Sequence, residues 1–406
     1  MAAEPAMDAV SFNQLETFER SDYLDRAEAI GKIGEAHARE TDREARASDP
    51  LIETIKNAQI ADIWKPRRYG GVGGNMPDYS DMIRTVSRYD MAAGWLTFFY
   101  SIHEVWVGYM TPEGREEVYG DGGLVADVLA PVGRAEQDGE NFRLSGQWNF
   151  SSGILHSSWV GLGAMAQLPD GNEPEYCLFV LPVSDCDIVK NWDTLGMRGT
   201  GSHGISLEDA LIPQHRVLTA GRVLFTGKPM GGDFDPEEPI YRMPFLPFFA
   251  GFFPAVALGG ADRIVEEFRK RTENRTRVYQ GNARSTSSDS SPRVMAELRM
   301  RQLEMEGLID QYLKQLESWR QETKVLVTPE EKALMFALRA QVARGGVDIA
   351  TTASQMLGGT AMFKGDPVEQ FTRDLITLGA HSSHLYEDAM TIYGGSIFGG
   401  PAHPVW

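Results

Sequence analysis

The chain has few cysteines, with only Cys177 and Cys186 among its 406 residues. Two thiols in a chain of this length cannot provide the disulfide framework that stabilises small secreted domains. Residues 1–5 contain neither a basic segment nor an apolar run, so the sequence predicts no secretory signal. We therefore expect a protein of the reducing cytoplasm.

Basic residues are also scarce, because 39 Lys and Arg face 57 Asp and Glu and the formal net charge is −18. A surface of this charge repels phosphate backbones, so nucleic acid is not an expected partner. The longest apolar run, at residues 245–260, is interrupted by prolines and is shorter than the roughly 20 residues of a membrane span. We expect no membrane partner either.

The chain also lacks a nicotinamide-binding domain. Gly199-x-Gly201-x-x-Gly204 has the spacing of a dinucleotide fingerprint, but such a fingerprint follows a buried strand and opens a helix. Residues 205–213 have the pattern of a strand and end at Pro213, so the glycines are predicted to lie on a loop between strands. The protein is therefore not expected to oxidise NADH on its own.

Three regions of different texture are present. Residues 11–119 have mostly helical patterns, residues 122–222 contain short strand-like runs separated by turn residues, and long amphipathic patterns such as residues 255–277 follow. We therefore predict an α+β fold. It comprises an N-terminal helical domain (1–121), a small central β-barrel or sheet domain (122–235) and a C-terminal helical bundle (236–406).

Three short segments carry a resemblance to a known family. Residues 192–202 read W-D-T-L-G-M-R-G-T-G-S, residues 147–153 read Q-W-N-F-S-S-G, and residues 355–359 read Q-M-L-G-G. Together with the order of helices, sheet and helices, they resemble the acyl-CoA dehydrogenase fold over nearly the whole chain. The resemblance implies a C-terminal four-helix bundle, a bound flavin, and a homotetramer in which the last of these segments reaches a neighbour's flavin.

The chain departs from the dehydrogenases near its C-terminus. Arg373-Asp374 resembles the pair that precedes their last active-site element, but at the distance of their catalytic glutamate this chain has His381. A histidine there resembles the group D two-component flavin-dependent monooxygenases, as do Gly94-Trp95 with His103 and residues 126–131. The resemblance implies an oxygenase component that receives FMNH2 or FADH2 from a separate NAD(P)H:flavin reductase. With O2 added at the flavin C4a carbon, it would hydroxylate a small aromatic of the phenol or indole type.

The resemblance also implies roles for individual residues. His381 would act as a base in its neutral form or as a hydrogen-bond donor to oxygen in its protonated form. Ser152 would lie near flavin N5, and His103 on the opposite wall. The expected cofactor-binding residues are Trp95, Val128, Leu129, Ala130, Ser151, Ser152, Gly153, Trp192, Arg198, Thr200, Arg277, Gln355, Gly358, Gly359, His381 and Ser382. Those expected to contact substrate are His103, Phe248, Phe249 and His384.

Each assignment has an ordinary structural alternative. A serine before a glycine in a strand turn commonly bonds its own backbone, and Arg198 would serve equally as an ion-pair partner. Arg271 and Arg275 compete with Arg277 for a flavin phosphate. His381 and His384 at i and i+3, with Asp388 beyond, suggest a metal site, but too few ligands surround them and no metal is predicted.

Two other functions stay open on the sequence. An acyl-CoA dehydrogenase would place its base elsewhere and oxidise an acyl thioester. A flavin-fold protein without catalytic activity would bind a ligand or partner and would turn over no reduced flavin.

Overall fold

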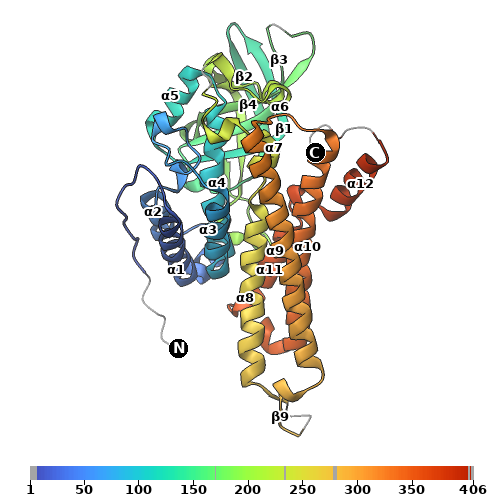
Figure 1. Cartoon of the computed structure of the whole chain (residues 1–406). Coiled ribbons are helices and arrows are strands. Elements are labelled where there is room, and N and C mark those ends of the chain that lie inside the picture. The colour runs from blue at the N-terminus through green and yellow to red at the C-terminus, as the bar shows by residue number, and fades with distance from the viewer. Residues whose placement is uncertain (1–6, 170, 233–234, 278–280, 401–402, 404–406) are drawn as a thin grey trace.

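The computed structural model describes residues 7–169, 171–232, 235–277, 281–400 and 403. Its elements follow the predicted order, and the α+β class is confirmed. A seven-stranded sheet lies at one end of a bundle of long helices, and the N-terminal helices pack along one side of that bundle (Figure 1).

Helix α4 forms the axis on which the other layers pack. It carries Trp95 and His103, and all of its 18 residues are buried. A helix that is apolar all round belongs in an interior, and the Asp90 side chain caps this one by accepting from the Ala93 amide. The N-terminal region consists of α1 (Arg20–Glu44), α2 (Asp49–Asn57), α3 (Met76–Tyr89), α4 (Met91–Gly108) and α5 (Pro112–Asp121).

The sheet follows the predicted strand pattern. Its spatial order is β5-β6-β2-β1-β3-β4-β7, in which β1 and β3 pair in parallel and the other neighbours are antiparallel. A hairpin turn joins β1 to β2, with Gly139 at a φ of 64° that favours glycine. The strands are β1 (Val125–Asp138), β2 (Asn141–Ser151), β3 (Trp159–Gln167), β4 (Pro174–Pro182), β5 (Asp187–Val189), β6 (His203–Ile212) and β7 (Val217–Leu218).

The C-terminal region is a bundle of long antiparallel helices. A short ribbon of β8 and β9 joins α8 to α9 at the end of the bundle farthest from the sheet (Figure 1). The elements are α6 (Ala220–Thr226), α7 (Phe245–Phe249), α8 (Phe253–Asn274), β8 (Thr276–Arg277), β9 (Ala283–Arg284), α9 (Ser290–Glu322), α10 (Pro329–Leu357), α11 (Pro367–Gly379) and α12 (Tyr386–Ile397).

The glycine motif lies where the sequence placed it. The 3-10 turn η5 (Arg198–Thr200) connects β5 to β6, and these two strands are antiparallel. A dinucleotide fingerprint would need a strand followed by a helix. The dinucleotide reading of this motif is therefore excluded.

Two local expectations are wrong. The helix predicted for residues 255–277 ends at Asn274, because its exposed last turn is not held by packing, and Arg277 lies in β8. The i, i+3 spacing of His381 and His384, which would put both on one face of an α-helix, does not do so here. His381 instead caps the 3-10 turn η12 (Ser382–His384) by accepting from the Ser383 amide, a local bond that competes with helix formation.

The apolar run at residues 245–260 lies in α7 and α8. By length and composition, one helical stretch among the described residues, Phe245–Asn274, is apolar enough to cross a membrane. In this structure 89% of its most apolar window is buried, as in a core helix.

Candidate active site

His381 packs on Trp95 of α4, and both His381 and His384 pack on Phe253 of α8. The ring of His381 lies 5.3 Å from that of Trp95 and 5.2 Å from that of Phe253, centroid to centroid. His384 meets the Phe253 ring edge-on at 4.8 Å. Helix α11 ends two residues before His381, so it is the packing of α11 against the bundle that delivers this histidine to α4.

The row of rings continues along α4 to the third histidine. Phe99 stacks on Trp95 at 4.5 Å and meets His103 at 4.8 Å. Beyond it, Phe249 stacks on His103 at 6.0 Å. We call these seven rings the aromatic row: His384, His381, Phe253, Trp95, Phe99, His103 and Phe249. Phe248, which was expected beside Phe249, packs instead on Trp64 and lies outside the row.

A chain of hydroxyl groups runs from the middle of the row. The Trp95 Nε1–H donates to Ser152 Oγ at 2.9 Å, and Ser152 Oγ lies 2.9 Å from Ser202 Oγ. Ser202 Oγ lies 2.7 Å from Thr200 Oγ1, which donates to the Met197 carbonyl at 2.7 Å. These side chains are all buried. Ser152 thus bonds other side chains and not its own backbone, so the structural alternative given above for this serine does not hold.

Buried polar atoms beside the row fit a polar ligand. Among the buried side-chain atoms without a hydrogen-bond partner in the described part of the chain, two belong to rings of the row, His384 Nε2 and His103 Nε2. Buried polar atoms in proteins nearly always have a partner, so such atoms mark places where a ligand or water belongs. An isoalloxazine ring offers both donors and acceptors, and the flat faces of the row suit it. The residues present therefore fit a flavin.

His381 and His384 have opposite free hydrogen-bonding groups, a donor on the first and an acceptor on the second. His381 Nδ1 accepts from the Ser383 amide at 3.2 Å, so in the neutral ring the proton is on Nε2. Burial and the nearby charge of Arg339 lower the pKa of His381 to about 4. His384 Nδ1 donates to the Leu378 carbonyl at 3.2 Å, which leaves Nε2 as an acceptor. Near neutral pH the pair offers one donor and one acceptor.

The His103 end of the row contains a carboxylate that the sequence reading missed. His103 Nδ1 lies 2.8 Å from the Val125 carbonyl, and its Nε2 lies 3.4 Å from Asp127 Oδ2. Trp106 Nε1 donates to the same carboxylate oxygen at 3.1 Å. Burial raises the pKa of Asp127, and His103 and Trp106 oppose that rise. The signal in the sequence is a lone acidic residue within the apolar run of residues 124–132.

The first strand bends beside this end of the row. Its register with β3 shifts between Val128 and Gly133, and the Leu129 carbonyl accepts from Tyr176. Val128 is buried, Leu129 is half-buried and Ala130 is exposed. The expected flavin segment 128–130 thus passes from the core to the surface. Nearby, Gly153 donates its amide to the Thr200 carbonyl, so the predicted strand turn and glycine motif are joined.

Arg198 and Trp192 are engaged by the protein itself. Arg198 donates to the Asp42 carbonyl at 2.6 Å and pairs with Asp193 at 2.7 Å. Trp192 Nε1 donates to the Met197 carbonyl at 3.1 Å. The half-buried Trp192 also lines a surface cleft of about 470 Å³, together with Arg198 and His203. These contacts support the structural alternative for Arg198.

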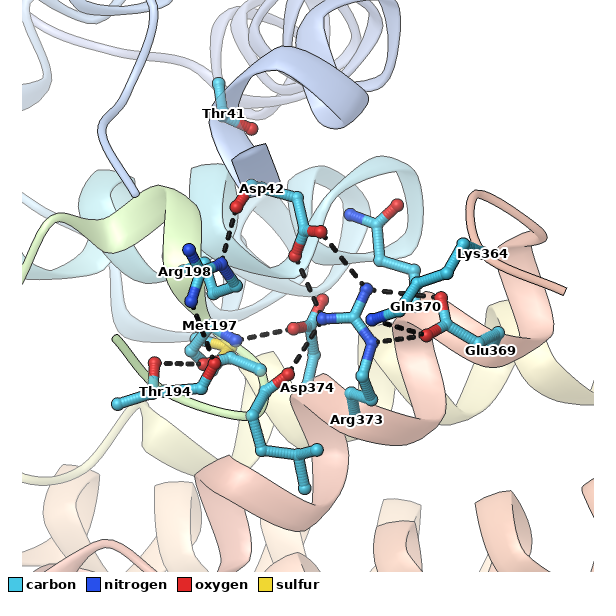
Figure 2. Close-up of polar contacts among 12 residues, drawn as sticks. Thr41, Asp42, Thr194, Met197, Arg198, Lys364, Glu369, Gln370, Arg373 and Asp374 are labelled. Carbon is cyan, nitrogen blue, oxygen red and sulfur yellow. Dashed lines mark hydrogen bonds and ion pairs between the residues drawn. The ribbon is translucent and has the colours of Figure 1, made fainter. Parts of the chain in front are cut away.

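The Arg373-Asp374 pair locks α11 to this loop. Figure 2 shows the Arg373 guanidinium between the carboxylates of Asp42 and Glu369. Arg373 Nη1 also donates to the Leu195 carbonyl at 2.8 Å. Asp374 accepts from the Met197 amide at 2.5 Å. Burial and neighbouring carboxylates raise the pKa of Asp374 to about 7. The pair therefore positions the glycine motif relative to the helix that leads to His381.

The remaining predicted residues lie at the other end of the bundle. Arg277 Nη2 lies 3.2 Å from the hydroxyls of Ser290 and Ser291, and Arg275 donates to the Met356 and Leu357 carbonyls. Arg271 forms an ion pair with Asp366. We call the following residues the distal group: Arg275, Arg277, Gln355, Gly358 and Gly359.

The distal group and the aromatic row are far apart within one chain. Arg339, whose charge acts on His381, and Gly358, at the end of the same helix, are separated by 19 residues of α10. At about 1.5 Å per residue this is roughly 28 Å along the axis. The structure therefore brings together Trp95, Ser152, Thr200, His381 and His384, and it leaves the distal group outside that site.

Ser202 is a second residue that the sequence reading missed. It belongs to the segment G-T-G-S that marked the family, but its contact with Ser152 depends on how β2 and the glycine motif meet in space. Across the described part of the chain, no three His, Cys, Asp or Glu side chains gather as a metal-binding group.

Comparison with known proteins agrees with this architecture. Residues 252–386 match the family described as "Acyl-CoA dehydrogenase, C-terminal domain". A solved structure of XiaF from a Streptomyces species, in complex with FADH2 and glycerol, has a TM-score of 0.85 at 23% identity. The match covers 94% of this chain and 96% of that one. The acyl-CoA dehydrogenase-like fold expected from the sequence is confirmed.

Curated relatives are similar over most of their length. A pigment production hydroxylase of a Rhodococcus species is 26% identical over 366 residues, which are 89% of this chain and 92% of the relative. The oxygenase component of p-hydroxyphenylacetate 3-hydroxylase from Acinetobacter baumannii is 26% identical over 370 residues, which are 87% of this chain and 83% of the relative. The resemblance to two-component flavin-dependent monooxygenases is confirmed by these matches.

Proposed function

We propose that this protein is the oxygenase component of a two-component flavin-dependent monooxygenase that hydroxylates a small aromatic substrate. The observation that carries the proposal is the packing of His381 on Trp95, since the resemblance implies a carboxylate base of the dehydrogenases at this position of the sequence. Its curated relatives carry hydroxylase and oxygenase-component names, which supports the same function. A separate flavin reductase is then the partner, and a cytoplasmic location fits the sparse cysteine content.

The bound reduced flavin, FMNH2 or FADH2, would supply two electrons and, after reaction with O2, the oxygen atom. The chain's own groups would orient and protect this chemistry. Trp95 and Phe99 offer ring faces, and the buried hydroxyl of Ser152 lies beside them. Exclusion of water by the aromatic row would limit side reactions of the oxygenated cofactor.

His381 and His384 would donate and accept protons in the reaction. His381 stays neutral above about pH 5 because its pKa is lowered to about 4, and it presents Nε2–H as a donor toward oxygen. Acting as a base at Nδ1 would require breaking the bond from Ser383. His384 Nε2 is the available acceptor, suited to a phenolic O–H or an indole N–H.

The distal group supports the proposal of a homotetramer. Its glycines are open, since an added Cβ at Gly358 or Gly359 would meet no atom within 4 Å. Beside them the side chain of Phe363 is 71% exposed. An open, polar and apolar surface roughly 28 Å from the row along α10 suits a contact with another subunit's flavin.

Chemically reduced FMN or FAD, O2 and a panel of phenols and indoles test the function without a reductase. We expect a hydroxylated product that carries one ¹⁸O atom from labelled O2. NADH supplied without a reductase should not be consumed. Reduction of the purified, flavin-loaded protein by an acyl-CoA would establish the dehydrogenase instead, and flavin binding with no turnover of any reduced flavin would establish a non-catalytic protein.

A further inference from the structure

The hydroxyl chain beside Trp95 has a fixed direction. Thr200 Oγ1 donates its single proton to the Met197 carbonyl, which has none to give. The short contact between Thr200 and Ser202 must then use the proton of Ser202. The contact between Ser202 and Ser152 must in turn use the proton of Ser152.

The far end of this chain is anchored by a buried carboxylate. The amide of Met197 donates to Asp374 Oδ1 at 2.5 Å, while its carbonyl accepts from Thr200 and from Trp192 Nε1. The amide and the carbonyl of Met197 belong to adjacent peptide groups, so the bond to Asp374 holds in place the residue whose carbonyl receives the Thr200 proton. Asp374 thereby fixes Met197 against α11, and the direction of the hydroxyl chain is built into the fold.

Ser152 is left with only one hydrogen-bonding capacity. A serine hydroxyl has one proton and two acceptor sites. The proton is used toward Ser202, and one acceptor site is used by the Trp95 Nε1–H. The remaining site accepts and does not donate.

This asymmetry distinguishes the two redox states of a flavin. Reduced flavin carries a proton on N5 and is a donor there, whereas oxidised flavin has an unprotonated N5 and is an acceptor. Resting on the function proposed above, we propose that Ser202 and Thr200 are positioning residues that hold Ser152 as an acceptor and thereby select reduced over oxidised flavin. An oxygenase that collects its cofactor from a reductase by diffusion needs this discrimination.

Anaerobic titrations of the full-length protein with reduced and oxidised FMN, and with FAD in parallel, give the ratio of the two dissociation constants. Ser202→Ala removes the acceptor for the Ser152 proton, and Thr200→Val lets the Ser202 proton turn toward Ser152. In both variants Ser152 becomes able to donate to oxidised flavin. We expect the preference for reduced flavin to fall about 3- to 10-fold, the equivalent of one hydrogen bond.

Two control variants separate this effect from general loosening. Thr200→Ser keeps the hydroxyl chain and should keep the preference. Ser206→Ala removes a hydroxyl from β6 outside the chain and should change nothing. Thermal unfolding of each variant shows that the compared proteins are folded.

Different results would contradict the role of the hydroxyl chain and the proposed function. An unchanged ratio in both Ser202→Ala and Thr200→Val would overturn the positioning role, as would a wild-type protein that binds the two forms equally while still hydroxylating substrate. Failure of the wild-type protein to bind either flavin would overturn the proposed function and the inference together.

Discussion

The two ends of the helical bundle are built in opposite ways. Around the aromatic row the side chains of Trp95 and Ser152 are only 5% and 3% exposed, and they are joined to each other and to Ser202 by hydrogen bonds. At the distal group, glycines face open space and Phe363 is exposed. The first end has the character of a protein interior and the second that of an exposed surface. The function proposed above assigns the chemistry to the first end and a contact with a neighbouring subunit to the second.

The sharpest test of the first end is His381→Ala. Loss of a positioned proton donor should lower the rate of product formation by about 10²- to 10⁴-fold. Binding of reduced flavin should persist, because Trp95 and Ser152 remain. Quenched-flow measurement of product and anaerobic titration of flavin check the two parts. His215→Ala, at a histidine beside Glu117, is the matched control and should retain activity.

The division of labour between the ends is tested by subunit mixing. Gly359→Phe fills open space, so the single chain should fold but fail to complete a neighbour's site. When this variant and His381→Ala are co-assembled, random pairing in a symmetric oligomer should regenerate roughly a quarter of the sites. Activity of the mixture above the sum of the two variants measures this recovery. No recovery, with both variants tetrameric, would place the whole site within one chain.

Arg198→Met asks whether the glycine motif contacts flavin through its arginine. Because Arg198 bonds Asp42 and Asp193, we expect its loss to lower the free energy of unfolding by about 1–3 kcal/mol. Flavin affinity should change little. A large fall in affinity with unchanged thermal stability would instead make Arg198 a cofactor ligand.

The smallest expected effect is a dependence of stability on pH. A carboxylic acid whose pKa is raised in the folded state, as for Asp374 at about 7, binds its proton more tightly when folded. Its contribution should therefore be greatest below its unfolded pKa of about 4 and decline as the pH rises to about 7. Tm measured across this range should fall for the wild type and fall less steeply for Asp374→Asn. An equal slope in the two proteins would contradict the assignment.

Much of the architecture could be predicted from local patterns. Alternation in residues 142–150 and the turn at Gly139 set β2 and its hairpin, and the strand after the glycine motif was distinguishable from a helix by its proline. The end of α8 was not predictable, because propensity alone does not report where tertiary packing stops. The turn at His381 was hidden because a side-chain cap replaces helical bonding there.

The site was only partly predictable, because its members are joined by contacts between distant segments. Ser152 and His381 were identified by family likeness, and both contact Trp95. Ser202 and Asp127 carry no local mark of their partners, which come from other strands and from α4. The structure also indicates the tautomer of His381. The sequence was compatible with a base or with a hydrogen-bond donor at this position, and the bond from the Ser383 amide to Nδ1 favours the donor role of Nε2–H.

The length of α10 has a consequence of its own. This helix joins the surroundings of His381 to the glycines of the distal group with no break over 29 residues. The length of α10 therefore fixes the distance between the two groups, and inserting one full turn of helix would move one end by about 5.4 Å without altering any contacting residue. A relative with a longer or shorter bundle could keep every site residue and still be unable to co-assemble with this chain.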